Sequence, residues 1–205
     1  MRIIAGELRG RRIEAPEGDA TRPMLDRVRE AVFSTLGPVV EDAVVLDLFA
    51  GSGALGLEAA SRGARAVRSI ERAAKALVAL KSNVAELGLS DRVRVIRGDA
   101  LSPKSWHDSD ALDVRYSLVF MDPPYPMIED PTERTDVLKA IRALFDSALT
   151  PDATLVLHVA ARASETLRFG PALERDVRLY GSSAIVYVAR QASGESRDAT
   201  ERDRV

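Results

Sequence analysis

The chain has 205 residues, 46% of them hydrophobic, which is enough to bury one sizeable core without cross-links. It has no cysteine, which excludes disulfides, thiolate nucleophiles and cysteine-based metal sites. A formal net charge of −2 argues against indiscriminate nucleic-acid binding by the whole surface. The start, MRIIAGELRG, lacks the apolar run of a signal peptide, and no uncharged apolar stretch reaches the roughly 18 residues of a membrane helix. We therefore expect a soluble, cytoplasmic protein.

The N-terminal segment is basic and precedes the first clear strand–helix unit. The stretch RIIAGELRGRRIEAP predicts two short strands around a turn, and LDRVREAVFSTL predicts a helix. We treat residues 1–40 as an extension docked on the main domain. The basic charge comes from Arg2, Arg9, Arg11 and Arg12, against the single acid Glu7.

The predicted N-terminal helix is amphipathic. Its apolar residues recur at helical spacing and predict a buried stripe, with charged residues on the opposite side. The stripe consists of Leu25, Val28, Val32 and Leu36, and the opposite side of Asp26, Arg29 and Glu30.

From residue 41 the sequence alternates short apolar runs with helical patterns. Repeated β-then-α units predict an α/β fold, a mostly parallel twisted sheet with helices on both faces. VRLYGSSAIVYVAR predicts a closing hairpin that adds an antiparallel edge strand, and the polar tail 192–205 is expected to be disordered. The predicted strands are 44–49, 66–71, 92–99, 116–122 and 154–160, and the predicted helices are 54–63, 72–89 and 135–149.

A glycine-rich loop lies where the first strand of the domain meets the first helix. LDLFAGSGALGLEA has G-x-G-x-x-G spacing at Gly51, Gly53 and Gly56, which nucleotide-binding folds share. Glycines there let backbone N–H groups approach a ligand closely. A turn that serves only to pack the strand against the helix gives the same spacing, so the motif alone does not establish nucleotide binding.

Three acids follow three successive strands: Asp47, Glu71 and Asp99. Because the carboxyl ends of parallel strands meet at one edge, these acids bracket a pocket at the topological switch point. The position of Asp47 suits a cation, Glu71 can accept from a ribose diol, and Asp99 can accept from an adenine amino group. S-adenosylmethionine carries a sulfonium, an amino acid and an adenosine, and so matches this set better than a diphosphate.

The stretch SLVFMDPPYP runs a buried strand into an acid, two prolines and a tyrosine. A purine exocyclic amine is a poor nucleophile, because its lone pair is delocalised into the ring. Acceptors on its N–H groups, such as the Asp122 carboxylate and the Pro123 carbonyl, free that lone pair. The fixed φ of Pro123 and Pro124 holds these oxygens stiffly, and Tyr125 offers a flat face for an extruded base. A rigid turn without chemistry is the alternative.

Taken together, D-x-F-A-G-S-G, an acidic strand end, G-D-A and D-P-P-Y resemble the class I S-adenosylmethionine-dependent methyltransferases, which implies a Rossmann-like fold. Within that class RIIAGELRGRRIEAP, TRPMLDRVREAVF and LDLFAGSGALGLEAASRGA resemble the RsmD family, bacterial 16S rRNA guanine-N2 methyltransferases. The resemblance runs from residue 2 to about 187. It departs from the family pattern at Met24 and Leu25, where threonines are usual.

The resemblance implies methyl transfer to N2 of a guanine in the 16S rRNA of the 30S subunit, by a monomer without a metal. It implies that residues 41–191 form the methyltransferase domain and that D-P-P-Y, which is Asp122, Pro123, Pro124 and Tyr125, holds the base. The implied cofactor residues are Asp47, Phe49, Ala50, Gly51, Ser52, Gly53, Glu71, Arg72, Asp99 and Ala100. The implied RNA-binding residues are Arg2, Arg9, Arg11, Arg12 and Arg22.

Other interpretations stay open from the sequence. D-P-P-Y also fits an N6-adenine DNA methyltransferase or an enzyme that methylates glutamine amides, and the glycine spacing fits an NAD-dependent oxidoreductase. A catalytically inactive RNA-binding module is a further alternative. Arg22 and Arg27 either contact a phosphate or cofactor carboxylate, or pair with Asp26 or Glu30. His158 is interpreted as a strand residue with a partner rather than as a base, and no metal cluster is expected.

Overall fold

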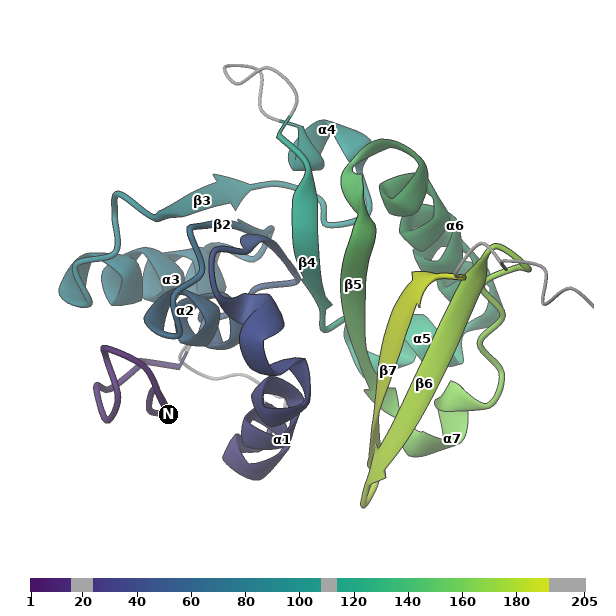
Figure 1. Cartoon of the computed structure of the whole chain (residues 1–205), viewed down its shortest axis with the longest axis horizontal. Coiled ribbons are helices and arrows are strands. Elements are labelled where there is room, and N and C mark those ends of the chain that lie inside the picture. Colours follow the sequence, from purple (N-terminus) through teal and green to yellow (C-terminus); the bar gives the residue numbers. More distant parts are fainter. Residues whose placement is uncertain (16–23, 108–113, 192–205) are drawn as a thin grey trace, which may run out of the picture.

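A seven-stranded sheet forms the centre of the molecule, with strand order β3-β2-β1-β4-β5-β7-β6 (Figure 1). The computed structural model describes residues 1–15, 24–107 and 114–191, so Arg22 and the tail from residue 192 lie outside the described residues. Strands β1 to β5 pair in parallel, and β7 pairs antiparallel with both β5 and β6. The strands are β1 (Val44–Leu48), β2 (Ala66–Glu71), β3 (Val93–Arg97), β4 (Tyr116–Met121), β5 (Leu149–Ala160), β6 (Leu173–Tyr180) and β7 (Ser183–Arg190).

Helices cover both faces of the sheet. The N-terminal segment and α1 to α3 pack on one face, and α4 to α7 pack on the other. The helices are α1 (Asp26–Leu36), the 3₁₀ helix η1 (Gly37–Val40), α2 (Ala54–Ser61), α3 (Ala74–Glu86), α4 (Pro103–Trp106), α5 (Tyr125–Glu129), α6 (Pro131–Ser147) and α7 (Ala161–Ser164).

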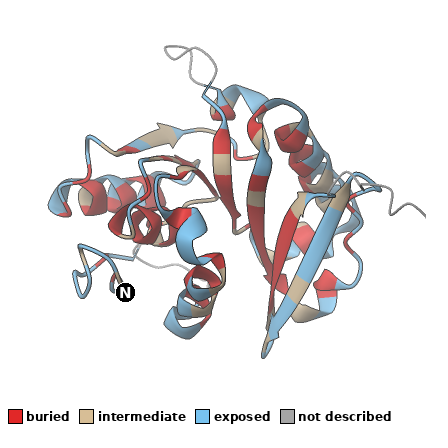
Figure 2. Cartoon of the chain, viewed as in Figure 1, coloured by how far each residue is buried: buried red, intermediate tan, exposed pale blue. Residues whose placement is uncertain are grey.

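Alternating side chains of the central strands supply both apolar layers. Val45 of β1 packs toward α1–α3 and Leu46 toward α4–α7, as the two-residue period of a strand requires. The inner strands are therefore buried on both faces, whereas β6 exposes much of its length (Figure 2). Among the described residues, no helix is long and apolar enough to cross a membrane.

The predicted fold class is confirmed, and each strand and helix predicted from residue 41 onward is present within a few residues of its expected ends. The closing hairpin is β6 and β7: β7 pairs antiparallel with β5, and β6 pairs antiparallel with β7 at the edge of the sheet. One detail differs. The short helices α4, α5 and α7 were not predicted, since four or five residues carry too little periodicity to signal a helix.

The N-terminal segment folds back on itself as predicted, but its pairing is too short to form two regular strands. An antiparallel bridge joins Arg2 and Arg12, and the Ile3 N–H donates to the Arg11 carbonyl at 3.0 Å, while bends and turns occupy the residues between them. The main chain also bonds to another part of the protein: the N–H groups of Ile4 and Ala5 donate to Glu58 of α2 at 2.7 and 3.0 Å. Local and long-range hydrogen bonds together hold the segment.

The predicted buried stripe of α1 is confirmed at Val28, Val32 and Leu36, but the predictions for Leu25 and Arg29 were wrong. Leu25 is 69% exposed, because it precedes the first helical residue in an extended conformation, and Met24 is buried in its place. Arg29, expected on the solvent side, is 0% exposed. Its guanidinium donates to the Arg2 carbonyl and to Asp26, so the docked N-terminal segment buries it.

Candidate active site

The loop after β1 turns sharply away from the sheet. Phe49, Gly51 and Gly53 have φ values of 60°, 57° and 86°, a left-handed conformation that is uncommon for a residue such as phenylalanine. A Cβ built on Gly51 would meet nothing within 4 Å, whereas one on Gly53 would lie 2.4 Å from Cδ1 of Leu80. Gly51 therefore borders open space where a ligand can lie. Gly53 is required by the packing of α3 against the loop.

Glu71, at the end of β2, holds this loop. Its Oε2 accepts the Gly51 N–H at 2.9 Å, and its Oε1 accepts the N–H groups of Arg72 and Ala73 at 2.8 and 2.7 Å. An ionised carboxylate has about four lone-pair sites. Three are occupied here, which leaves one on the half-buried side chain for a ligand hydroxyl.

Asp47 lies beneath the loop rather than on its open side. Its carboxylate is buried and accepts the Gly56 N–H, in the first turn of α2, at 3.0 Å. Burial raises the pKa of Asp47 to about 7; the Gly56 hydrogen bond opposes the shift, and the charges of Asp122 and Glu71 add to it. The structure thus gives the Asp47 carboxylate a partner within the protein, and its contact with a ligand stays a prediction. Asp47 joins the strand end to the helix start.

The remaining predicted cofactor residues lie around the same edge. Asp99 is exposed, and its Oδ1 accepts the Leu101 N–H at 3.0 Å, while Ala100 is buried behind it. Phe49 and Ala50 are half-buried, Ser52 is buried and Arg72 is exposed. Asn83, which the sequence did not single out, donates to the Ser52 carbonyl at 2.9 Å and so fixes the loop from α3.

The D-P-P-Y segment lies beside this loop at the end of β4. The Asp122 N–H donates to the Leu48 carbonyl at 3.3 Å, and the Asp122 side chain is 30% exposed. Pro124 precedes α5 and its carbonyl accepts the Met127 N–H, whereas no described residue donates to the carbonyl of Pro123. The structure thus leaves the Asp122 carboxylate partly exposed at the end of β4, and Pro123 itself is buried.

Two residues outside the predicted site complete it. His158 on β5 has its Nδ1 2.8 Å from Oδ1 of Asp122 and its Nε2 3.3 Å from the Tyr125 hydroxyl. That hydroxyl is 2.9 Å from Oγ of Ser183 on β7. His158 was predicted to be a strand residue with a side-chain partner, and this is confirmed. Its partners are Asp122 and Tyr125, both in the D-P-P-Y segment. The register signals this: Leu157 pairs with Met121, so His158 and Asp122 both come next.

The carboxylates and open acceptor sites at this edge fit a cationic methyl donor that carries a nucleoside. Carboxylates at the ends of β1, β2 and β4 lie close enough for Asp122 and Glu71 to perturb Asp47. They give the edge a negative charge that suits a sulfonium and disfavours a diphosphate. Gly51 supplies the open side, and the free acceptor sites of Glu71 and Asp99 suit a ribose hydroxyl and an amino group.

The predicted RNA-binding arginines divide into two groups. Arg2 donates to the Gly10 carbonyl at 2.8 Å and Arg11 to the Glu86 carbonyl at 2.7 Å, so both hold the N-terminal segment. Arg9 and Arg12 are exposed and form no side-chain hydrogen bond or ion pair within the described residues. Among the four of these arginines that the structure describes, Arg9 and Arg12 alone present uncommitted charge.

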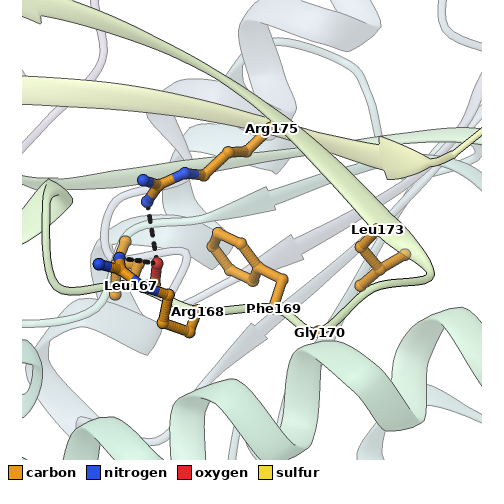
Figure 3. Close-up of a pocket in the computed structure, with 6 residues that line it drawn as sticks. All are labelled: Leu167, Arg168, Phe169, Gly170, Leu173 and Arg175. Atoms are coloured by element: carbon orange, nitrogen blue, oxygen red, sulfur yellow. Dashed lines mark hydrogen bonds between the residues drawn. The ribbon is translucent and has the colours of Figure 1, made fainter.

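A separate hollow of about 290 Å³ lies at the other end of the sheet, lined by Leu167 to Gly170, Leu173 and Arg175 (Figure 3). Arg175 donates to the Leu167 carbonyl at 2.9 Å across it. Leu173 pairs with Arg190, at the opposite end of β7 from the site residue Ser183. None of the predicted site residues lines this hollow, and we assign it no part in the site.

The sheet order, the left-handed loop and the acid-lined edge define a class I methyltransferase, a class that uses S-adenosylmethionine. Solved structures agree. Putative methyltransferase yhhF from Escherichia coli superposes with a TM-score of 0.74 at 31% identity, covering 94% of this chain and 98% of that one. An RNA methyltransferase from Salinibacter ruber, in complex with S-adenosyl-L-homocysteine, shares the fold at a TM-score of 0.57 and 23% identity, covering 88% of this chain and all of that one.

Sequence comparison gives the family. The model of the family described as Conserved hypothetical protein 95 matches residues 1–189. Ribosomal RNA small subunit methyltransferase D of Escherichia coli (strain K12) is 36% identical over 199 residues, 96% of this chain and 93% of the relative. Putative rRNA methyltransferase YlbH of Bacillus subtilis is 38% identical over 146 residues, 71% and 74% of the two chains. The chain belongs to this family, the RsmD family, and the resemblance found in its motifs is confirmed.

Proposed function

We propose that this protein transfers a methyl group from S-adenosylmethionine to the N2 amine of a guanine in the 16S rRNA of the small ribosomal subunit. The observation that carries the proposal is the end of β4, where the partly exposed Asp122 follows β4 and its N–H bonds to Leu48, at the end of the strand that leads into the Gly51 loop. Relatives named as small-subunit rRNA methyltransferases support the substrate class.

S-adenosylmethionine supplies a methyl group on a positively charged sulfur, which is already an activated donor. In this site Gly51 leaves room for it, and Glu71 and Asp99 each keep an acceptor site for its ribose and adenine groups. The clustered carboxylates favour a cation at this edge by simple Coulomb attraction. The same charges oppose the phosphates of a dinucleotide, which argues against oxidoreductase chemistry.

The residues of D-P-P-Y prepare the amine. Asp122 and the Pro123 carbonyl can each accept one N–H of the exocyclic nitrogen, which frees its lone pair and stabilises the positive charge that develops on it. The proton released afterwards passes to Asp122 or to water. The Tyr125 ring is half-buried at the same place and offers a stacking face to a base that has left its stack.

We further propose that the enzyme acts on the 30S subunit in the cytoplasm, as a monomer and without a resident metal. Arg9 and Arg12 would contact RNA phosphates, which position the substrate without reading its sequence. Within residues 1–15, 24–107 and 114–191, no three histidine, aspartate or glutamate side chains gather as metal ligands would. The extension at residues 1–40 would deliver RNA to the domain at 41–191.

The test is incorporation of labelled methyl groups into small subunits that lack the modification. Assembled subunits, deproteinised rRNA and duplex DNA are incubated in parallel with the enzyme and labelled S-adenosylmethionine, and the product nucleosides are separated. The proposal expects N2-methylguanosine from the ribosomal substrates. Recovery of N6-methyladenosine, or label only in DNA, would contradict it.

A further inference from the structure

His158 contacts the two side chains of D-P-P-Y that meet the substrate in the proposed function. Its Nδ1 is 2.8 Å from Asp122 and its Nε2 is 3.3 Å from the Tyr125 hydroxyl, and the Tyr125 and His158 rings pack edge to face with centroids 5.7 Å apart. The His158 side chain is 6% exposed. One buried ring therefore bridges the acceptor and the stacking platform.

The polarity of these hydrogen bonds follows from the chemistry of each group. An ionised carboxylate only accepts, so Nδ1 of His158 carries a proton toward Asp122. If the ring is neutral, Nε2 accepts from the Tyr125 hydroxyl, which in turn accepts from Ser183. If the ring is protonated, the two outer bonds reverse and the Nδ1 bond stays as it is.

This arrangement leaves Asp122 with one oxygen bound and the other available. Oδ1 is held by the imidazole, and no hydrogen bond within the described residues occupies Oδ2. The prolines stiffen the main chain at this point, but they do not fix the torsion angles of the Asp122 and Tyr125 side chains. His158 supplies that second constraint.

We propose that His158 is a positioning residue for methyl transfer: its ring orients the Asp122 carboxylate and the Tyr125 ring toward the acceptor base. This inference rests on the proposed function, because it assigns a role to residues placed there. His158 touches none of the reacting atoms. Its effect is to hold the acceptor oxygen at the distance where a small displacement costs a large part of the rate.

The kinetic test compares substitutions that keep or remove each contact. His158→Ala removes both, and we expect kcat to fall between about 10-fold and 100-fold while the Kd for S-adenosylmethionine changes less than about twofold. His158→Asn keeps an amide donor near the position of Nδ1 and should recover most of the loss. Tyr125→Phe keeps the stacking face and should cost less than His158→Ala, with Tyr187→Phe, on β7 and outside the site, as its control. Equal rates for the Ala and Asn variants would overturn the inference.

A spectroscopic test needs no substrate. The chain has two histidines, so ¹⁵N spectra of the imidazoles are assigned by comparison with His158→Ala. We expect a protonated Nδ1 in the wild-type protein and appearance of the Nε2–H form in Asp122→Ala. An unprotonated Nδ1 in the wild-type protein would refute the inference. A wild-type enzyme that fails to methylate rRNA would refute the proposed function, and the spectra would still decide whether His158 donates to Asp122 through Nδ1.

Discussion

Two carboxylates in this protein show how differently one functional group can be used. Glu58 is 0% exposed and accepts three hydrogen bonds, from the N–H groups of Ile4 and Ala5 and from the Arg62 guanidinium, and it lies 3.9 Å from Nε of Arg29. Asp122 is 30% exposed and has one side-chain partner within the described residues. A buried carboxylate with several protein partners stabilises the fold, whereas a partly exposed carboxylate with one partner at a strand end can bind a ligand.

The largest expected effect is the loss of stability on replacing Glu58, the buried carboxylate. Glu58→Ala removes one of the two carboxylates beside the buried Arg29 and leaves the N–H groups of Ile4 and Ala5 without their acceptor, so we expect a loss of about 3–5 kcal/mol in the free energy of unfolding. Denaturant titration measures it. Glu86→Ala on the exposed side of α3 is the matched control and should stay within about 0.5 kcal/mol. If Glu58→Ala unfolds with the wild-type free energy, the burial of Arg29 does not depend on the charge of Glu58.

Asp122→Ala, in contrast to Glu58→Ala, should lower the rate of methyl transfer and leave the stability of the protein nearly unchanged. We expect kcat to fall by about 10²–10³-fold, because the amine loses an acceptor for its developing charge, while the melting temperature and the affinity for S-adenosylmethionine change little. Single-turnover methylation and calorimetry separate the two effects. Asp136→Ala, an exposed acid of α6, is the charge control. A rate unchanged by Asp122→Ala would support a binding module over an enzyme.

Asp47 is the intermediate case, a buried carboxylate with one hydrogen bond. Since its folded pKa of about 7 lies above the ordinary value of 3.8, the folded protein binds more protons than the unfolded chain between those values. Its contribution is full below about pH 4 and falls as the pH rises, by about 1.4 kcal/mol between pH 6 and 8.

Asp47→Asn keeps the acceptor for the Gly56 N–H and removes the charge. The wild-type melting temperature should therefore drop between pH 6 and 8 by about 3 to 6 °C more than that of the variant. Thermal unfolding followed by circular dichroism at the two pH values tests this. If the melting temperatures of the two proteins fall equally between pH 6 and 8, ionisation of Asp47 does not affect the stability of the fold.

The smallest expected effect concerns the exposed charge of the N-terminal segment. Arg9→Ala and Arg12→Ala should each weaken RNA binding evenly across sequences and reduce the slope of log affinity against log salt by about 1. Folding should be unaffected, because neither side chain holds the segment in place. Lys139→Ala on the opposite face of the sheet serves as the control. An identical salt dependence for all three variants would place the RNA elsewhere.

The sequence was most informative where structure is local. The strand Val44–Leu48 and the glycine loop follow from hydrophobic pattern and backbone freedom within a few residues, and D-P-P-Y stands out by its composition. The sequence did not show that Arg29 would be buried, because its partners lie on the docked segment and on α2. Nor did it show the contact between His158 and Asp122, which depends on how β4 and β5 align. Side-chain partnerships across 36 residues leave no periodic signal.

The docking of the first residues has a consequence for biosynthesis. The Ile4 N–H bonds to a side chain 54 positions further on, and Glu14 exchanges two hydrogen bonds with Asn83, 69 positions further on. During translation the leading end of the chain therefore emerges long before its binding surface has been made. The segment cannot dock until α2 and α3 have folded, so the first part synthesised takes its final place only after later parts of the chain have done so.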